Sequence, residues 1–194
     1  MSESVTTEWK NAFMGEVSRH ENAMQLRDAA VEENLGEWTK ALTAVAVSTC
    51  EGLGWYASAI GHRLELLPVA RHEYLALDVM AFSESEGRWR FPVAVMELEN
   101  SKDDDRVAYS LWKVLCVRTD FRLVFCYRSD PEAGRGLVRF LQEQVVKPMG
   151  IATRYGLTGE TALVVGSREE SAMFPYGFFT WWKLDKNTGT FSLI

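Results

Sequence analysis

The sequence predicts an α/β (α+β) protein in which a mixed β-sheet is flanked by helices. Two observations support this fold class: several apolar runs have the length of buried strands, and the segments between them carry apolar residues at helical spacing. The chain has 194 residues, of which 47% are hydrophobic and 12% aromatic, so it can bury a sizeable core. We therefore expect a single domain over residues 1–194.

Composition excludes several classes of protein. No apolar run approaches the roughly 20 residues of a membrane helix, and the first residues lack the basic and apolar regions of a signal peptide, so we expect no membrane partner and a cytoplasmic location. The three cysteines (Cys50, Cys116 and Cys126) are widely spaced, which favours buried reduced thiols over disulfides or zinc. The net charge of −6 gives the chain no overall basic excess with which to bind nucleic acid.

Two helices are predicted at the start of the chain. Residues Thr7–Glu33 carry apolar side chains at intervals of three and four, and Thr6 or Thr7 is a suitable N-cap. A break at Asn34–Gly36 separates this segment from a second amphipathic helix, Leu35–Cys50. We expect the second helix to pack directly on the sheet.

The central strands come next. The type of structure at Trp55–Ile60 is ambiguous, and Arg63–Val69 is predicted to be a first strand. Residues Tyr74–Phe82 and Phe91–Met96 are apolar on both alternating faces, which predicts strands covered on both sides. The short polar stretch Ser83–Arg90 suits a connection between antiparallel neighbours.

Acidic residues interrupt these apolar strands. Asp78 lies within the first run, and Glu97 and Glu99 follow the second at positions that share one face of a strand. A hairpin would bring Asp78 close to both glutamates, so we expect three carboxylates at one sheet edge. A purely structural interpretation stays open: the glutamates mark the point where the strand enters solvent, and Asp78 caps a turn or pairs with an arginine.

The rest of the chain alternates between helices and strands. After a polar loop the expected elements are a helix over Asp104–Arg118, a strand over Phe121–Tyr127, a helix over Gly136–Lys147, a strand over Thr161–Val165, and a hairpin of Tyr176–Leu184 with Thr190–Ile194. The order from the second helix onward is helix, three strands, helix, strand.

This order, with acids on the second and third strands, resembles the PD-(D/E)XK nuclease-like superfamily. That family has the restriction endonuclease-like α-β-β-β-α-β core, with an Asp on one strand and an Asp or Glu two residues before a Lys on the next. The resemblance covers about residues 36–129, with the N-terminal helix and C-terminal β-hairpin as additions. Asp78 matches the first acid and Glu97 the second, but Glu99 stands where the family has lysine.

The resemblance implies roles for these residues and for others nearby. Glu99 would orient or deprotonate the attacking water, and Lys102 or Lys113 would supply the missing positive charge. In such folds an acid on the helix before the first core strand often helps to hold the metal, which makes Glu51 and Glu37 further candidates.

The implied activity is metal-dependent hydrolysis of phosphodiesters in DNA. Hard oxygen ligands suit Mg²⁺ or Mn²⁺, and Asp78, Glu97, the carbonyl of Leu98 and Glu51 are the expected ligands. A partner subunit would supply the positive surface that this acidic chain lacks. Many members of the superfamily are dimers, so a homodimer is also expected by analogy. Two rival interpretations remain: a catalytically inactive protein-binding module of the same fold, and a small-molecule-binding domain in which Asp78 and Glu97 are structural.

Overall fold

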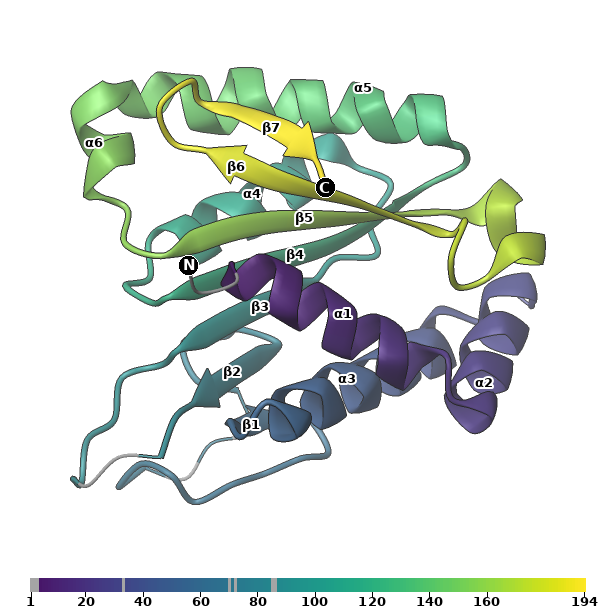
Figure 1. Cartoon of the computed structure of the whole chain (residues 1–194), viewed down its shortest axis with the longest axis horizontal. Coiled ribbons are helices and arrows are strands. Elements are labelled where there is room, and N and C mark those ends of the chain that lie inside the picture. The colour runs from purple at the N-terminus through teal and green to yellow at the C-terminus, as the bar shows by residue number, and fades with distance from the viewer. Residues whose placement is uncertain (1–3, 33, 70, 72, 85–86) are drawn as a thin grey trace.

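The computed structural model describes residues 4–32, 34–69, 71, 73–84 and 87–194. Its centre is a seven-stranded sheet in which the strands follow one another in sequence order (Figure 1). In chain order these strands are β1 (Tyr56–Ala59), β2 (Val79–Phe82), β3 (Ala94–Leu98), β4 (Phe121–Arg128), β5 (Glu160–Ser167), β6 (Phe179–Asp185) and β7 (Thr190–Leu193). The strands β1, β2 and β3 are antiparallel neighbours, β3 to β5 are parallel, and β5 to β7 are antiparallel. The predicted mixed sheet is confirmed.

Helices cover both faces of this sheet. They are α1 (Val5–Val17), α2 (His20–Val31), α3 (Leu35–Gly52), α4 (Asp104–Leu115), α5 (Pro131–Leu141) and α6 (Gly150–Gly156), with shorter turns η1 (Gln142–Val146), η2 (Lys147–Met149) and η3 (Arg168–Met173). One face is packed by α1 and α3, and the other by α4 and α5 (Figure 1). Parallel neighbours such as β3 and β4 need a crossover, and α4 provides it.

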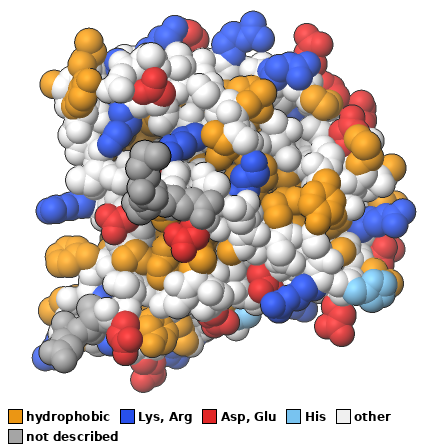
Figure 2. Space-filling model, in the orientation of Figure 1, with side chains coloured by type: hydrophobic (Ala, Val, Ile, Leu, Met, Phe, Trp, Pro, Cys, Tyr) orange, Lys and Arg blue, Asp and Glu red, His pale blue; other side chains and the backbone are white. Residues whose placement is uncertain are grey.

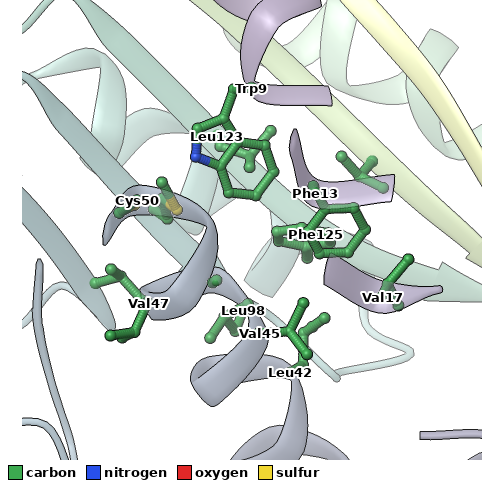
Figure 3. Close-up of a cluster of buried hydrophobic side chains, with 14 of the residues drawn as sticks. Trp9, Phe13, Val17, Leu42, Val45, Val47, Cys50, Leu98, Leu123 and Phe125 are labelled. Atoms are coloured by element: carbon green, nitrogen blue, oxygen red, sulfur yellow. The ribbon is translucent and has the colours of Figure 1, made fainter. Parts of the chain in front are cut away.

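The core between α1, α3 and the sheet is rich in aromatic residues. Trp9 and Phe13 of α1 are fully buried and stack with ring centroids 5.2 Å apart. The ring centroid of Phe13 also lies 5.3 Å from that of Phe125 in β4. Figure 3 shows both rings beside the aliphatic side chains of α3. Every residue of β2 and β3 is buried, which confirms that these strands are covered on both faces.

The N-terminal segment contains two helices, so the prediction of one helix over Thr7–Glu33 was wrong. The helix α1 ends at Val17 and α2 begins at His20. At the break, the Ser18 hydroxyl donates to the carbonyl of Met14, 2.6 Å away, and so competes with the helical backbone pattern.

The first strand is β1, not the predicted Arg63–Val69. The ambiguous segment Trp55–Ile60 therefore supplies the strand, through its pairing of Tyr56 with Phe82. After β1 the chain turns at Gly61, which has a φ of +81°, and forms only an isolated bridge between Ala59 and His62. Residues 63–69 form no strand, and β1 takes the position next to β2 at the edge of the sheet.

Other boundaries also differ from the prediction. The strand expected over Tyr74–Phe82 begins only at Val79, and the helix expected over Gly136–Lys147 begins at Pro131, where Asp130 caps it by accepting from the Glu132 and Ala133 N–H groups. The helix α6 was not predicted. The loop Ser83–Arg90 includes residues 85 and 86, which lie outside the described residues.

Two smaller expectations have different outcomes. Cys50 and Cys126 are buried as predicted, but Cys116 is exposed, because it follows the last residue of α4 at the surface. In the part of the chain that the structure describes, no helix combines the length and the hydrophobicity that a bilayer crossing requires.

Glu160 at the start of β5 fastens the N-terminus of α1 to the sheet. Its Oε2 accepts from Ser4 Oγ (2.7 Å), Thr6 Oγ1 (2.6 Å) and the Thr6 N–H (2.9 Å), and its Oε1 pairs with Lys183 Nζ at 2.7 Å. Burial acts to raise the pKa of Glu160, but the hydrogen bonds from Lys183, Thr6 and Ser4 outweigh it and lower the pKa to about 2. The ionised form therefore stabilises the fold.

Replacing Glu160 with glutamine is expected to lower the free energy of unfolding at pH 7 by about 1 to 3 kcal/mol. Because the folded pKa lies below that of the unfolded chain, this difference is present above pH ~4.5 and disappears as the pH falls towards ~2. Urea denaturation at several pH values measures it, with the exposed Glu84→Gln as a matched control. A difference that does not change with pH would contradict the role of the charge.

Candidate active site

Asp78 and Glu97 face each other across the β2–β3 pair. Val79 pairs with Met96 in this antiparallel ladder, so Asp78, the residue before β2, lies opposite Glu97. Alternation along the strands puts both side chains on the sheet face that α4 covers, with Met80 and Val95. The Asp78 carboxylate is fixed there, because its Oδ2 accepts from the Leu98 N–H at 2.6 Å.

Glu97 is a buried carboxylate with one cationic neighbour. Its side chain is only 6% exposed, and Lys113 Nζ of α4 lies 2.8 Å from Oε1. This ion pair is the closest polar contact of Oε1 among the described residues. Burial raises the pKa of Glu97 to about 7, and the charge of Asp78 acts in the same direction, while Lys113 and the Ser110 hydroxyl oppose it.

Asp78, like Glu97, is a largely buried carboxylate with a raised pKa. Burial raises the pKa of Asp78 above its usual value, and the charge of Glu99 adds to this effect. The Leu98 N–H and Lys113 act to lower it. Two neighbouring carboxylates with raised pKa values indicate a site that favours either protons or a cation.

Lys113 is held in place by an unusual turn before Asp78. Its ammonium group donates to the carbonyl of Ala76 at 2.6 Å as well as contacting Glu97. Leu75 and Ala76 both have positive φ values, 57° and 53°, which residues with a Cβ rarely adopt. Backbone strain of this kind often accompanies functional sites, where it fixes the direction of a group. Here it directs a carbonyl oxygen at the lysine.

Glu99 does not join the other two carboxylates as a third ligand. Its Oε1 accepts from the Ser101 N–H at 2.7 Å, and the Ser110 hydroxyl lies 3.5 Å from its Oε2. Within the described ranges of the chain, no group of three acidic, histidine or cysteine side chains is arranged to hold a metal ion. The expected cluster is therefore a pair, Asp78 and Glu97, with Glu99 turned towards the start of α4.

The other predicted site residues have different positions. Of the two candidate lysines, the structure brings Lys113 to the carboxylates, whereas Lys102 is exposed and borders a separate cavity with Arg128 and Glu169. Glu51 is exposed at the end of α3, on the opposite face of the sheet and beside the far end of β2. The structure does not bring Glu51 to this site. Glu37 is likewise exposed, in the first turn of α3, where Lys40 is its ionic neighbour at 4.0 Å.

Two groups of the site were missed by sequence reasoning. Ser110 lies one turn before Lys113 on α4, and its polar side chain on an otherwise apolar buried face was the available signal. The carbonyl of Ala76 had no signal, because backbone groups are not distinguished by residue type.

Comparison of the chain with protein-family models, with curated proteins and with solved structures found no match. The arrangement of Asp78, Glu97 and Lys113 is therefore the main indication of function.

Proposed function

We propose that this protein is a metal-dependent phosphodiester hydrolase of the PD-(D/E)XK nuclease-like type that acts on DNA. The element order α3–β1–β2–β3–α4–β4 supports this proposal, since it has the sequence helix, three antiparallel strands, helix and parallel strand. The observation that carries the proposal is the set of three side chains on one face: Asp78, Glu97 and, 2.8 Å from Glu97, Lys113.

Lys113 takes the role of the lysine that the motif lacks at Glu99. In the family pattern the lysine follows the second acid on the same strand, whereas here it comes from the crossover helix α4 and contacts the second acid directly. An ammonium group in this position neutralises charge that develops on a phosphate during attack. The fixed contact with the Ala76 carbonyl keeps it oriented before substrate binds.

The pair of carboxylates fits a divalent cation. Mg²⁺ is commonly held by one or two carboxylates and several waters, so a third acidic side chain is not required. The two carboxylates lie opposite each other on one face of the sheet, and burial raises the pKa of both, so a cation between them would offset charge that water cannot reach. Asp78 and Glu97 would hold the ion, and the carbonyl of Leu98 stays a predicted ligand. When bound, such an ion lowers the pKa of a coordinated water and offsets negative charge on the phosphate.

The remaining residues act on protons and orientation. Glu97 has a pKa of about 7, so it releases a proton near neutral pH when a cation is bound. Glu99 lies two residues after Glu97, just beyond the end of β3, and we assign it the orientation of the attacking water. The Ser110 hydroxyl interacts with both glutamates. It acts to lower the pKa of Glu97, and its Oγ lies 3.5 Å from Oε2 of Glu99.

Calorimetric titration with Mn²⁺ tests the metal site. We expect the wild type to bind Mn²⁺ and Asp78→Asn to lose at least tenfold in affinity. Binding to the wild type should strengthen between about pH 6 and pH 8, because Glu97 must lose its proton. Glu51→Gln is the matched control and should bind as the wild type does. A wild type that takes up no Mn²⁺ would reject the catalytic proposal and favour the inactive protein-binding module.

A further inference from the structure

Two exposed aromatic rings lie side by side on α4. Tyr109 is 60% exposed and Trp112 is 55% exposed, and their ring centroids are 5.9 Å apart with planes only 22° from parallel. In the described part of the chain, no other stacked ring pair has both rings exposed. We call Tyr109 and Trp112 the aromatic platform.

The platform is not needed to fold α4. The helix buries a separate apolar stripe against the sheet, formed by Val107, Leu111 and Val114. Tyr109 and Trp112 are one turn apart and project from a different side of the helix. Exposed aromatic surface of this kind contributes little to stability, so it needs another explanation.

The platform is joined to the candidate active site by a single side chain. The ammonium group of Lys113 lies over the ring of Tyr109, 5.9 Å from its centroid, and the same group lies 2.8 Å from Glu97 Oε1. A phosphate at the carboxylates would therefore have an aromatic face beside it. Leu75, which is 71% exposed, precedes the residue whose carbonyl binds Lys113 and adds apolar surface near the site.

We propose that the aromatic platform stacks with an unpaired base of single-stranded nucleic acid whose phosphodiester lies at Asp78 and Glu97. This inference rests on the proposed function and names its substrate class. Stacking needs a free base face, which a base inside a duplex does not offer. The cation–π contact of Lys113 with Tyr109 places a positive charge where the adjoining phosphate would lie.

The charges around the platform favour stacking over binding of a duplex backbone. Arg106 and Lys113 lie about one turn to either side of Tyr109 on α4, and Asp105 is an acidic neighbour, so only a few positive charges surround the platform. The whole chain has a net charge of −6, and in Figure 2 basic and acidic side chains are interspersed. Duplex binding depends on many phosphate contacts from a basic surface, whereas a single strand adds base stacking to a few phosphate contacts, such as those that Lys113 and Arg106 offer here.

The test measures binding of a short fluorescent oligothymidylate by anisotropy, in a Glu97→Gln background so that the strand is not cleaved. Adding Tyr109→Leu and Trp112→Leu together should weaken binding at least tenfold. Adding Tyr109→Phe and Trp112→Phe keeps both rings and should retain the affinity. Tyr155→Leu is the matched control, since Tyr155 is 64% exposed on α6, away from the platform.

The inference would be overturned by equal binding of the strand to the leucine and parent proteins, or by a parent that binds the paired duplex as tightly as the single strand. Loss of a dimer in the leucine variant, seen by sedimentation, would also overturn it, because the platform would then be a self-association surface. Cleavage of the strand by wild type with Mn²⁺ separates the two proposals. If the wild type cleaves the strand but the leucine variant binds it as tightly as the parent, only the role of the platform is rejected. If the rings are needed for binding but the wild type does not cleave, the hydrolase proposal is rejected.

Discussion

Replacing Glu97 with glutamine is expected to make the protein more stable and inactive at the same time. Burial holds the pKa of Glu97 at about 7, well above that of an exposed glutamate, so its ionised form destabilises the fold. Such a group contributes stability below pH ~4.5 that is lost as the pH rises through about 7. The glutamine variant avoids this loss.

The expected gain in the free energy of unfolding is about 2 to 3 kcal/mol at pH 8 and under about 1 kcal/mol at pH 5. Urea denaturation at both pH values, without divalent ions, measures the gain. Glu51→Gln, an exposed glutamate on the opposite face of the sheet, should change stability by less than about 0.5 kcal/mol. If Glu97→Gln destabilises the protein at pH 8, then the glutamate is a structural ion-pair partner and the functional interpretation of its burial is wrong.

Lys113→Met is expected to have the opposite effect on stability. The substitution leaves Glu97 buried without its cationic neighbour and removes a hydrogen bond to the Ala76 carbonyl. We expect a loss of about 2 to 3 kcal/mol at pH 8, limited by the ability of Glu97 to take up a proton instead. At pH 5 the loss should be small, because Glu97 is then protonated in either protein.

Activity should fall in the Lys113 variant as well, by roughly a hundredfold or more in kcat, since a fixed positive charge beside the phosphate is removed. Lys102→Met is the matched control, because Lys102 is exposed and borders a different cavity, with Arg128 and Glu169. The double variant with Glu97→Gln measures the coupling between the two side chains. Additive effects in that cycle would show that the ion pair does not link them.

The sequence predicted the strands that carry the acids because both signals were local. Residues with apolar side chains on both faces identified β2 and β3, and the short connection between them placed Asp78 near Glu97. The first strand was placed wrongly because β1 has only four residues. Its pairing with β2, which is not visible in the local sequence, makes this segment a strand. Local pattern cannot distinguish such a strand from a loop.

The site itself was predicted only in part. Lys113 and Lys102 were equal candidates in the sequence, and only the packing of α4 on the sheet brings Lys113 to Glu97. Glu99 was expected beside the other acids, since it shares their face, but β3 ends at Leu98 and the Glu99 carboxylate accepts a hydrogen bond from the Ser101 N–H instead. Glu51 lies on a helix whose position relative to the sheet no local pattern specifies.

The most direct test of the central claim is cleavage of a labelled single-stranded DNA by the wild type and by Asp78→Asn, prepared identically, with Mn²⁺ and without it. We expect the wild type to cleave only when Mn²⁺ is present and the variant to show at least a thousandfold lower rate. Equal cleavage by both proteins, or none by either, would contradict the proposal that Asp78, Glu97 and Lys113 form the active site of a metal-dependent phosphodiester hydrolase.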